Sequence, residues 1–63
     1  MNFEFFQNHQ GTWTWELVTF GGQPIAQSTL TYPDRESCIH TIELMREDIV
    51  KTRIYDKADD RWI

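Results

Sequence analysis

The sequence predicts a small α+β domain in which a three-stranded antiparallel meander is covered by one helix, with a further strand after the helix. Two observations carry this prediction. The first thirty residues alternate apolar and polar side chains in runs broken by glycines, and the residues after Pro33 carry one apolar stripe at helical spacing. With 63 residues the chain forms one domain, residues 1–63, and a chain this short has only a marginal core.

The first strand is predicted over about residues 2–7, where Phe3 and Phe5 alternate with Glu4 and Phe6. The four residues after this strand have the composition of a turn. They end in Gly11, which adopts positive φ at no steric cost. We therefore expect a hairpin at this point.

The second strand is predicted over about residues 12–20 and has apolar side chains on both faces. Trp13, Trp15 and Leu17 share one face, whereas Val18 and Phe20 lie on the other. A single amphipathic helix covers only one face of a sheet, so we expect some of this aromatic surface to be left for a partner.

The pair Gly21-Gly22 predicts a two-residue hairpin loop of type I′ or II′. The third strand is predicted over about residues 24–30. It begins at or just after Pro24, because proline lacks an N–H group and is favoured at strand starts and edges.

A helix is predicted over about residues 34–50, because Pro33 and the acids after it suit a helix start. Its apolar stripe consists of Cys38, Ile42, Met45 and Ile49, with Ile39 beside it. After the helix, the alternation over about residues 51–56 predicts a fourth strand.

Composition narrows the class of protein. The net charge of −4 disfavours general binding to nucleic acid. The single Cys38 excludes an internal disulfide framework and fits a reducing compartment, so we expect a cytoplasmic protein. No apolar run is long enough for a signal peptide or a membrane span, and neither secretion nor membrane insertion is expected.

No motif for catalysis, cofactor binding or metal binding stands out, and we expect neither an enzyme nor a bound cofactor or metal. Glu36, His40 and Glu43 share one face of the predicted helix, a pattern more typical of a solvated face than of a zinc site. Cys38 and His40 point to opposite sides of the helix, so they do not form a nucleophile and base pair.

A basic stripe is predicted on one face of the fourth strand, where cations alternate with one aromatic ring. The residues are Lys51, Arg53, Tyr55 and Lys57. Such a stripe can bind single-stranded nucleic acid, with phosphates on the cations and a base on the ring. The other interpretation is an edge strand whose charges deter further strand pairing.

The order of motifs along nearly the whole chain resembles that of the YegP-like family of small domains. The matching features are FEFF, then TWTWEL, then GGQPIAQS, then Tyr32, then a helix with Ile42 and Met45 on its inner side. The sequence departs from the family pattern at Gly21, where Asn is usual, and at Thr41, where Gly is common.

The resemblance implies a β-β-β-α-β unit that occurs either as a tandem pair in one chain or as a single unit that dimerises. The two units join into one continuous sheet and exchange their C-terminal strands, so the single unit of this sequence implies a homodimer. It implies a fold and no activity, since the family has none established. The expected function is therefore that of a non-catalytic interaction or accessory module. The predicted interface residues are Trp13, Trp15, Lys51, Thr52, Arg53, Ile54, Tyr55 and Trp62.

Overall fold

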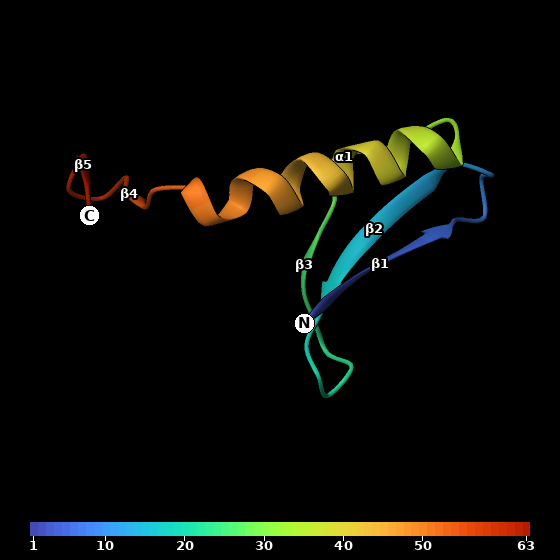
Figure 1. The fold of residues 1–63 in the computed structure, drawn as a ribbon, viewed down its shortest axis with the longest axis horizontal. Coiled ribbons are helices and arrows are strands. Elements are labelled where there is room, and N and C mark those ends of the chain that lie inside the picture. Colours follow the sequence, from blue (N-terminus) through green and yellow to red (C-terminus); the bar gives the residue numbers. More distant parts are fainter.

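The computed structural model describes all 63 residues and shows an α+β fold (Figure 1). Three strands form an antiparallel sheet in the order β1-β2-β3, and two more form a separate small hairpin, β4-β5. The elements are β1 (Asn2–Gln7), β2 (Trp13–Val18), β3 (Pro24–Gln27), α1 (Arg35–Asp48), the 3-10 turn η1 (Ile49–Lys51), β4 (Tyr55–Asp56) and β5 (Arg61–Trp62). The predicted meander and single helix are confirmed.

Both hairpins of the sheet have three-residue loops that end in a glycine with positive φ. In the first loop the N–H of Gly11, at φ 84°, donates to the carbonyl of Asn8. In the second loop the N–H of Gly22, at φ 83°, donates to the carbonyl of Thr19. The predicted two-residue loop at Gly21-Gly22 is therefore wrong. The strands close through the three-residue geometry, in which only the last loop residue needs the left-handed region.

β3 is shorter than the predicted strand over residues 24–30. The hydroxyl of Ser28 accepts a hydrogen bond from the N–H of Leu30 and donates one to its carbonyl, which turns the chain away from the sheet. The chain returns at Tyr32, whose N–H and carbonyl both pair with Trp13 at 2.8 Å.

α1 begins at an N-cap residue, Asp34, whose carboxylate accepts a 2.8 Å hydrogen bond from the N–H of Ser37. Hydrogen bonding to Ser37 also lowers the pKa of the Asp34 carboxyl. The helical residues end at Lys51, because Thr52 is extended and donates to the carbonyl of Ile49 from both its N–H and its hydroxyl.

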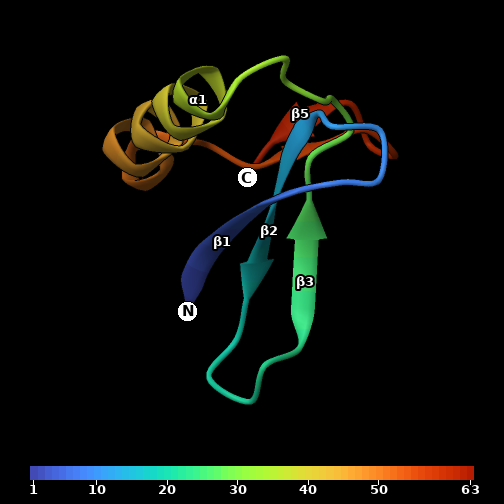
Figure 2. The ribbon, with the colours of Figure 1, turned by 90° about the vertical axis from the view of Figure 1, so that its right-hand side faces the viewer.

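The helix lies over one face of the sheet (Figure 2), and the side chains of Phe3, Phe5 and Leu17 on that face meet those of the helix. Phe3 lies opposite Leu17 and Phe5 lies opposite Trp15, so these four side chains share that face. The ring of Phe3 meets the ring of Trp15 edge-on at 5.5 Å, and that of Phe5 lies 5.9 Å from the ring of Trp13. The aromatic alternation in β1 and β2 thus supplies the surface on which α1 packs.

The core of the chain is small. Only three residues are buried, with exposed fractions of 5% for Val18, 0% for Cys38 and 8% for Ile42. The chain exposes 5341 Å², whereas a compact monomer of 7.6 kDa is expected to expose about 4300 Å². Its radius of gyration is 14.0 Å, against about 11 Å for a compact domain of this length. About 1000 Å² more surface is exposed than compact packing would leave.

The predicted fourth strand over residues 51–56 is largely wrong. Only Tyr55 and Asp56 are in a strand, which pairs with a fifth strand that was not predicted. The alternating pattern does not form one strand, because Lys51 belongs to the 3-10 turn and the chain reverses between Asp56 and Arg61. Neither β4 nor β5 contacts the sheet or α1 (Figure 1).

The loop geometry predicts different effects for adjacent glycines. Gly22→Ala is expected to lower the free energy of unfolding by about 1–2 kcal/mol, because alanine is strained at positive φ even where its Cβ meets no atom. Gly21→Ala is the control, since Gly21 has no positive φ and its added Cβ would lie 3.9 Å from Thr19 Oγ1. Its change should stay within about 0.5 kcal/mol in urea denaturation. Equal losses for the two variants would contradict the loop assignment.

Candidate interaction site

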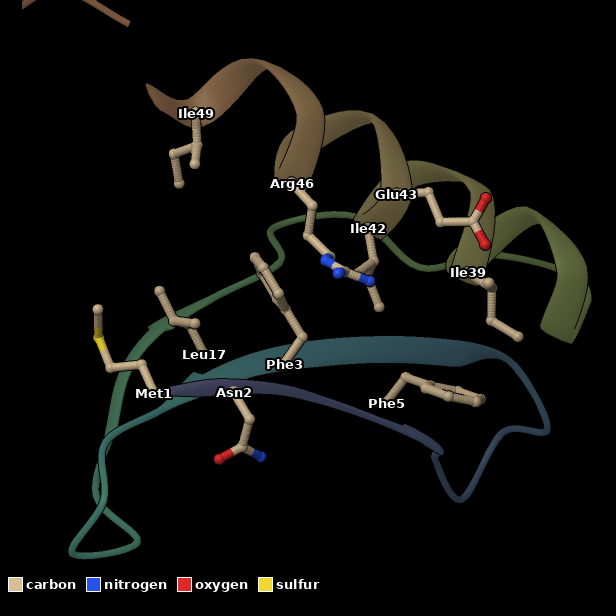
Figure 3. A pocket seen from close by; sticks show the side chains of 10 residues that line it. All are labelled: Met1, Asn2, Phe3, Phe5, Leu17, Ile39, Ile42, Glu43, Arg46 and Ile49. Atoms are coloured by element: carbon tan, nitrogen blue, oxygen red, sulfur yellow. The ribbon is translucent and has the colours of Figure 1, made fainter. Parts of the chain in front are cut away.

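An apolar groove of about 600 Å³ runs between α1 and the face of the sheet below it (Figure 3). Side chains enter it from both sides, Phe3 and Leu17 from β1 and β2 below and Ile42 and Ile49 from α1 and η1 above. Its apolar lining includes Phe3, Phe5, Leu17, Ile39, Ile42 and Ile49. A site with this lining binds mainly by burial of apolar surface.

Two charged side chains of α1, Glu43 and Arg46, also line this groove, and that of Arg46 extends toward Phe3 (Figure 3). Arg46 makes no ion pair, since the one ion pair of the molecule joins Arg61 to Asp59 at 4.0 Å. Nearer the start of the helix, the guanidinium of Arg35 lies 5.1 Å from the ring centre of Phe5. Cationic side chains thus lie at two positions along a mainly apolar surface.

The second apolar surface is the C-terminal hairpin, defined here as residues 54–63. The rings of Tyr55 and Trp62 meet edge-on at 4.9 Å, and the guanidinium of Arg53 lies 4.3 Å from the ring centre of Trp62. Ile54 and Ile63 flank this pair and are 66% and 78% exposed. The hairpin is thus ordered by its own aromatic pair but leaves most of its apolar surface uncovered.

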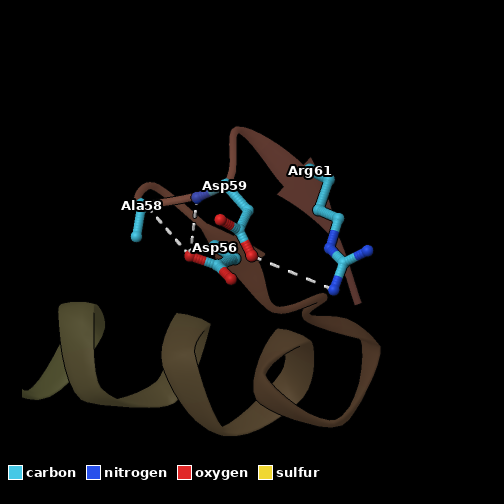
Figure 4. Close-up of polar contacts among 4 residues, drawn as sticks. All are labelled: Asp56, Ala58, Asp59 and Arg61. Carbon is cyan, nitrogen blue, oxygen red and sulfur yellow. Dashed lines mark hydrogen bonds and ion pairs between the residues drawn. The ribbon is translucent and has the colours of Figure 1, made fainter.

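The turn of the hairpin is held by one carboxylate (Figure 4). Asp56 Oδ1 accepts hydrogen bonds from the N–H groups of Ala58, at 2.9 Å, and Asp59, at 3.2 Å. Asp60 then takes a left-handed conformation with φ of 55°, which reverses the chain into β5. The ion pair between Arg61 and Asp59 is exposed and adds little.

The structure places the predicted interface residues in two separate regions. Trp13 and Trp15 lie half-buried on the helix-covered face of the sheet. The six predicted residues from Lys51 to Trp62 lie in and beyond η1, where β4 and β5 are remote from that face. The sequence pattern did not indicate that helix and sheet would leave an open groove between them.

The basic stripe does not lie along one strand face. Lys51 ends the 3-10 turn, Lys57 lies in the turn after β4, and only Tyr55 of the four residues is in a strand. Arg53 already stacks on Trp62. The alternation on which the stripe was predicted is therefore absent.

A polar cluster that the sequence did not reveal surrounds the hydroxyl of Tyr32. Its members are the side chains of Ser28, Thr41 and Trp15. Burial alone would raise the pKa of Tyr32, but hydrogen bonding of its ionised oxygen to Thr41 and Ser28 lowers the pKa by more, so the pKa lies below its usual value. Trp15 Nε1 is buried and makes no hydrogen bond. The pairing of Tyr32 with Trp13 across the sheet is what brings these residues together.

The remaining candidate residues lie on the exposed part of α1. Glu36, His40 and Glu43 are exposed on α1, and no group of three or more His, Cys, Asp or Glu side chains is arranged to hold a metal ion. No helix in the structure combines the length and the apolar character needed to cross a bilayer.

Comparison with known proteins gives no relative: no family model, no curated protein and no solved structure matches the chain. The resemblance to the YegP-like family therefore stays a prediction that depends on the motifs alone.

Cys38 is expected to be an unreactive thiol in the folded protein. It is fully buried, and burial raises the pKa of its thiol, so less thiolate is present at a given pH. A raised pKa also means that the thiol stabilises the fold below its ordinary pKa of about 8.5 and that this contribution is lost as the pH rises above it. Labelling by a chromogenic disulfide at pH 8 should be at least about tenfold slower than in denaturant. Equal rates would show that the thiol is accessible.

Proposed function

We propose that this chain is a non-catalytic interaction module of the YegP-like kind that acts as a homodimer. The observation that carries the proposal is the surface of one copy, 5341 Å² against about 4300 Å² for a compact monomer of the same mass. A standard protein interface covers about 800 Å² of each partner. The excess of about 1000 Å² is therefore of the size that one such interface would remove from water.

Exchange of the C-terminal segments is the form of dimer that the sequence resemblance implies. The detachment of β4 and β5 from their own sheet supports this form, since the segment has no packing partner in its own chain. The exposed fraction of Trp62 is 54%, although tryptophan is among the side chains that gain most from burial. A second copy supplies the missing cover without any other protein.

The proposal extends to the cytoplasm as the site of action. Its support is Cys38, a free and buried thiol in a chain with no second cysteine.

The alternative function, binding of single-stranded nucleic acid by Lys51, Arg53, Tyr55 and Lys57, has less support. These residues do not share a strand face, and the guanidinium of Arg53 is engaged by the ring of Trp62. If the alternative held, affinity for single-stranded DNA would fall steeply with added salt and would weaken in Arg53→Glu.

Sedimentation equilibrium at several loading concentrations tests the homodimer. We expect a mass of twice 7.6 kDa at protein concentrations of about 10 micromolar and above, because the excess surface is large enough for a stable interface. A mass of 7.6 kDa throughout would contradict the proposal.

A further inference from the structure

The C-terminal hairpin already satisfies much of its own backbone. The N–H of Ile63 donates to the carbonyl of Ile54 at 2.9 Å, β4 pairs with β5, and Asp56 caps the turn. Each strand is two residues long, so either outer edge offers few free groups for joining another sheet. What the hairpin presents to a partner is a set of apolar side chains on a preformed backbone.

The exit from α1 directs the hairpin away from its own groove. Thr52 is held extended, with φ −71° and ψ 150°, by its two hydrogen bonds to the carbonyl of Ile49. Only Thr52 and Arg53 lie between the end of η1 and the hairpin. The chain therefore continues roughly along the helix, past the edge of the sheet (Figure 1).

We propose that the groove between α1 and the sheet of one copy receives the C-terminal hairpin of a second copy, docked as a preformed unit. This proposal rests on the homodimer proposed above and adds the place and the form of the contact. The hairpin packs by side chains, with Ile54, Trp62 and Ile63 against the groove. It does not extend the partner's sheet, which differs from the continuous sheet that the resemblance implies.

Chemistry and size both favour this occupant. The groove is mainly apolar and open at Ile49, which is 49% exposed although it belongs to the apolar stripe of the helix. The hairpin carries the exposed apolar side chains that such a surface would cover. In a two-fold dimer each copy gives one hairpin and receives one, so both apolar surfaces of each chain are covered at once. The excess exposed surface of about 1000 Å² per chain is close to the area of about 800 Å² that each partner buries in a standard interface.

Adjacent residues of η1 give a matched pair of variants. Ile49→Glu places a charge in the groove and is expected to raise the dimer dissociation constant by at least about tenfold. Val50→Glu adds the same charge one residue along, at a side chain that is 83% exposed and outside the groove lining, and should change that constant less than about twofold. Sedimentation measures the constants, and circular dichroism checks that both variants fold. Equal effects of the two variants would overturn the proposal.

A measurement on the unaltered chain separates docking from dimerisation. Isotope-labelled and unlabelled copies are mixed, and filtered nuclear Overhauser effects between copies are recorded. We expect contacts from the Trp62 ring to methyl groups of Leu17, Ile42 or Ile49 of the other copy. A dimer without these contacts, or one in which they arise within a single copy, would overturn the docking but leave the homodimer. A monomer at every concentration would overturn both.

Discussion

The packing of α1 on the aromatic face of β1 and β2 is the contact on which the rest of the molecule depends. It is the only contact between the helix and the sheet, since α1 touches neither β3 nor the C-terminal hairpin. Cys38 and Ile42 are buried on the helix side of this contact, and the rings of Phe3 and Trp15 meet beneath it. Because the sheet is narrow and the helix crosses it, only part of the apolar stripe is covered. The uncovered part, which ends at Ile49, lines the helix side of the open groove.

Local interactions determine most of the remaining shape. Asp34 starts the helix, Thr52 ends it, and Gly11 and Gly22 close the two loops of the sheet. Each of these local interactions involves few residues and buries little apolar surface. The local backbone conformation is thus well determined, but much of the apolar surface stays exposed. A short chain in this condition gains most stability from a second copy. Burial of the groove and of the hairpin would stabilise the protein, and neither surface is covered within one chain.

Elements whose sequence pattern has one dominant period could be predicted. The alternation around Phe3 and Phe5 gave the first strand with its observed bounds, and the spacing of Cys38 and Ile42 gave the buried side of the helix. The C-terminal segment was not predictable in this way. Its alternation is too short to outweigh side-chain hydrogen bonds, and Thr52 and Asp56 fold it into a turn and a hairpin. The groove could not be predicted because it depends on where the helix crosses the sheet, which no local pattern encodes.

The concentration dependence of thermal unfolding tests most directly whether one copy is incomplete. If the folded state is a homodimer, mass action raises the melting temperature steadily over about a hundredfold increase in protein concentration. The measurement needs no substitution and no assumption about which residues meet. A melting temperature that is the same at both ends of that range would show that a single chain completes its own fold.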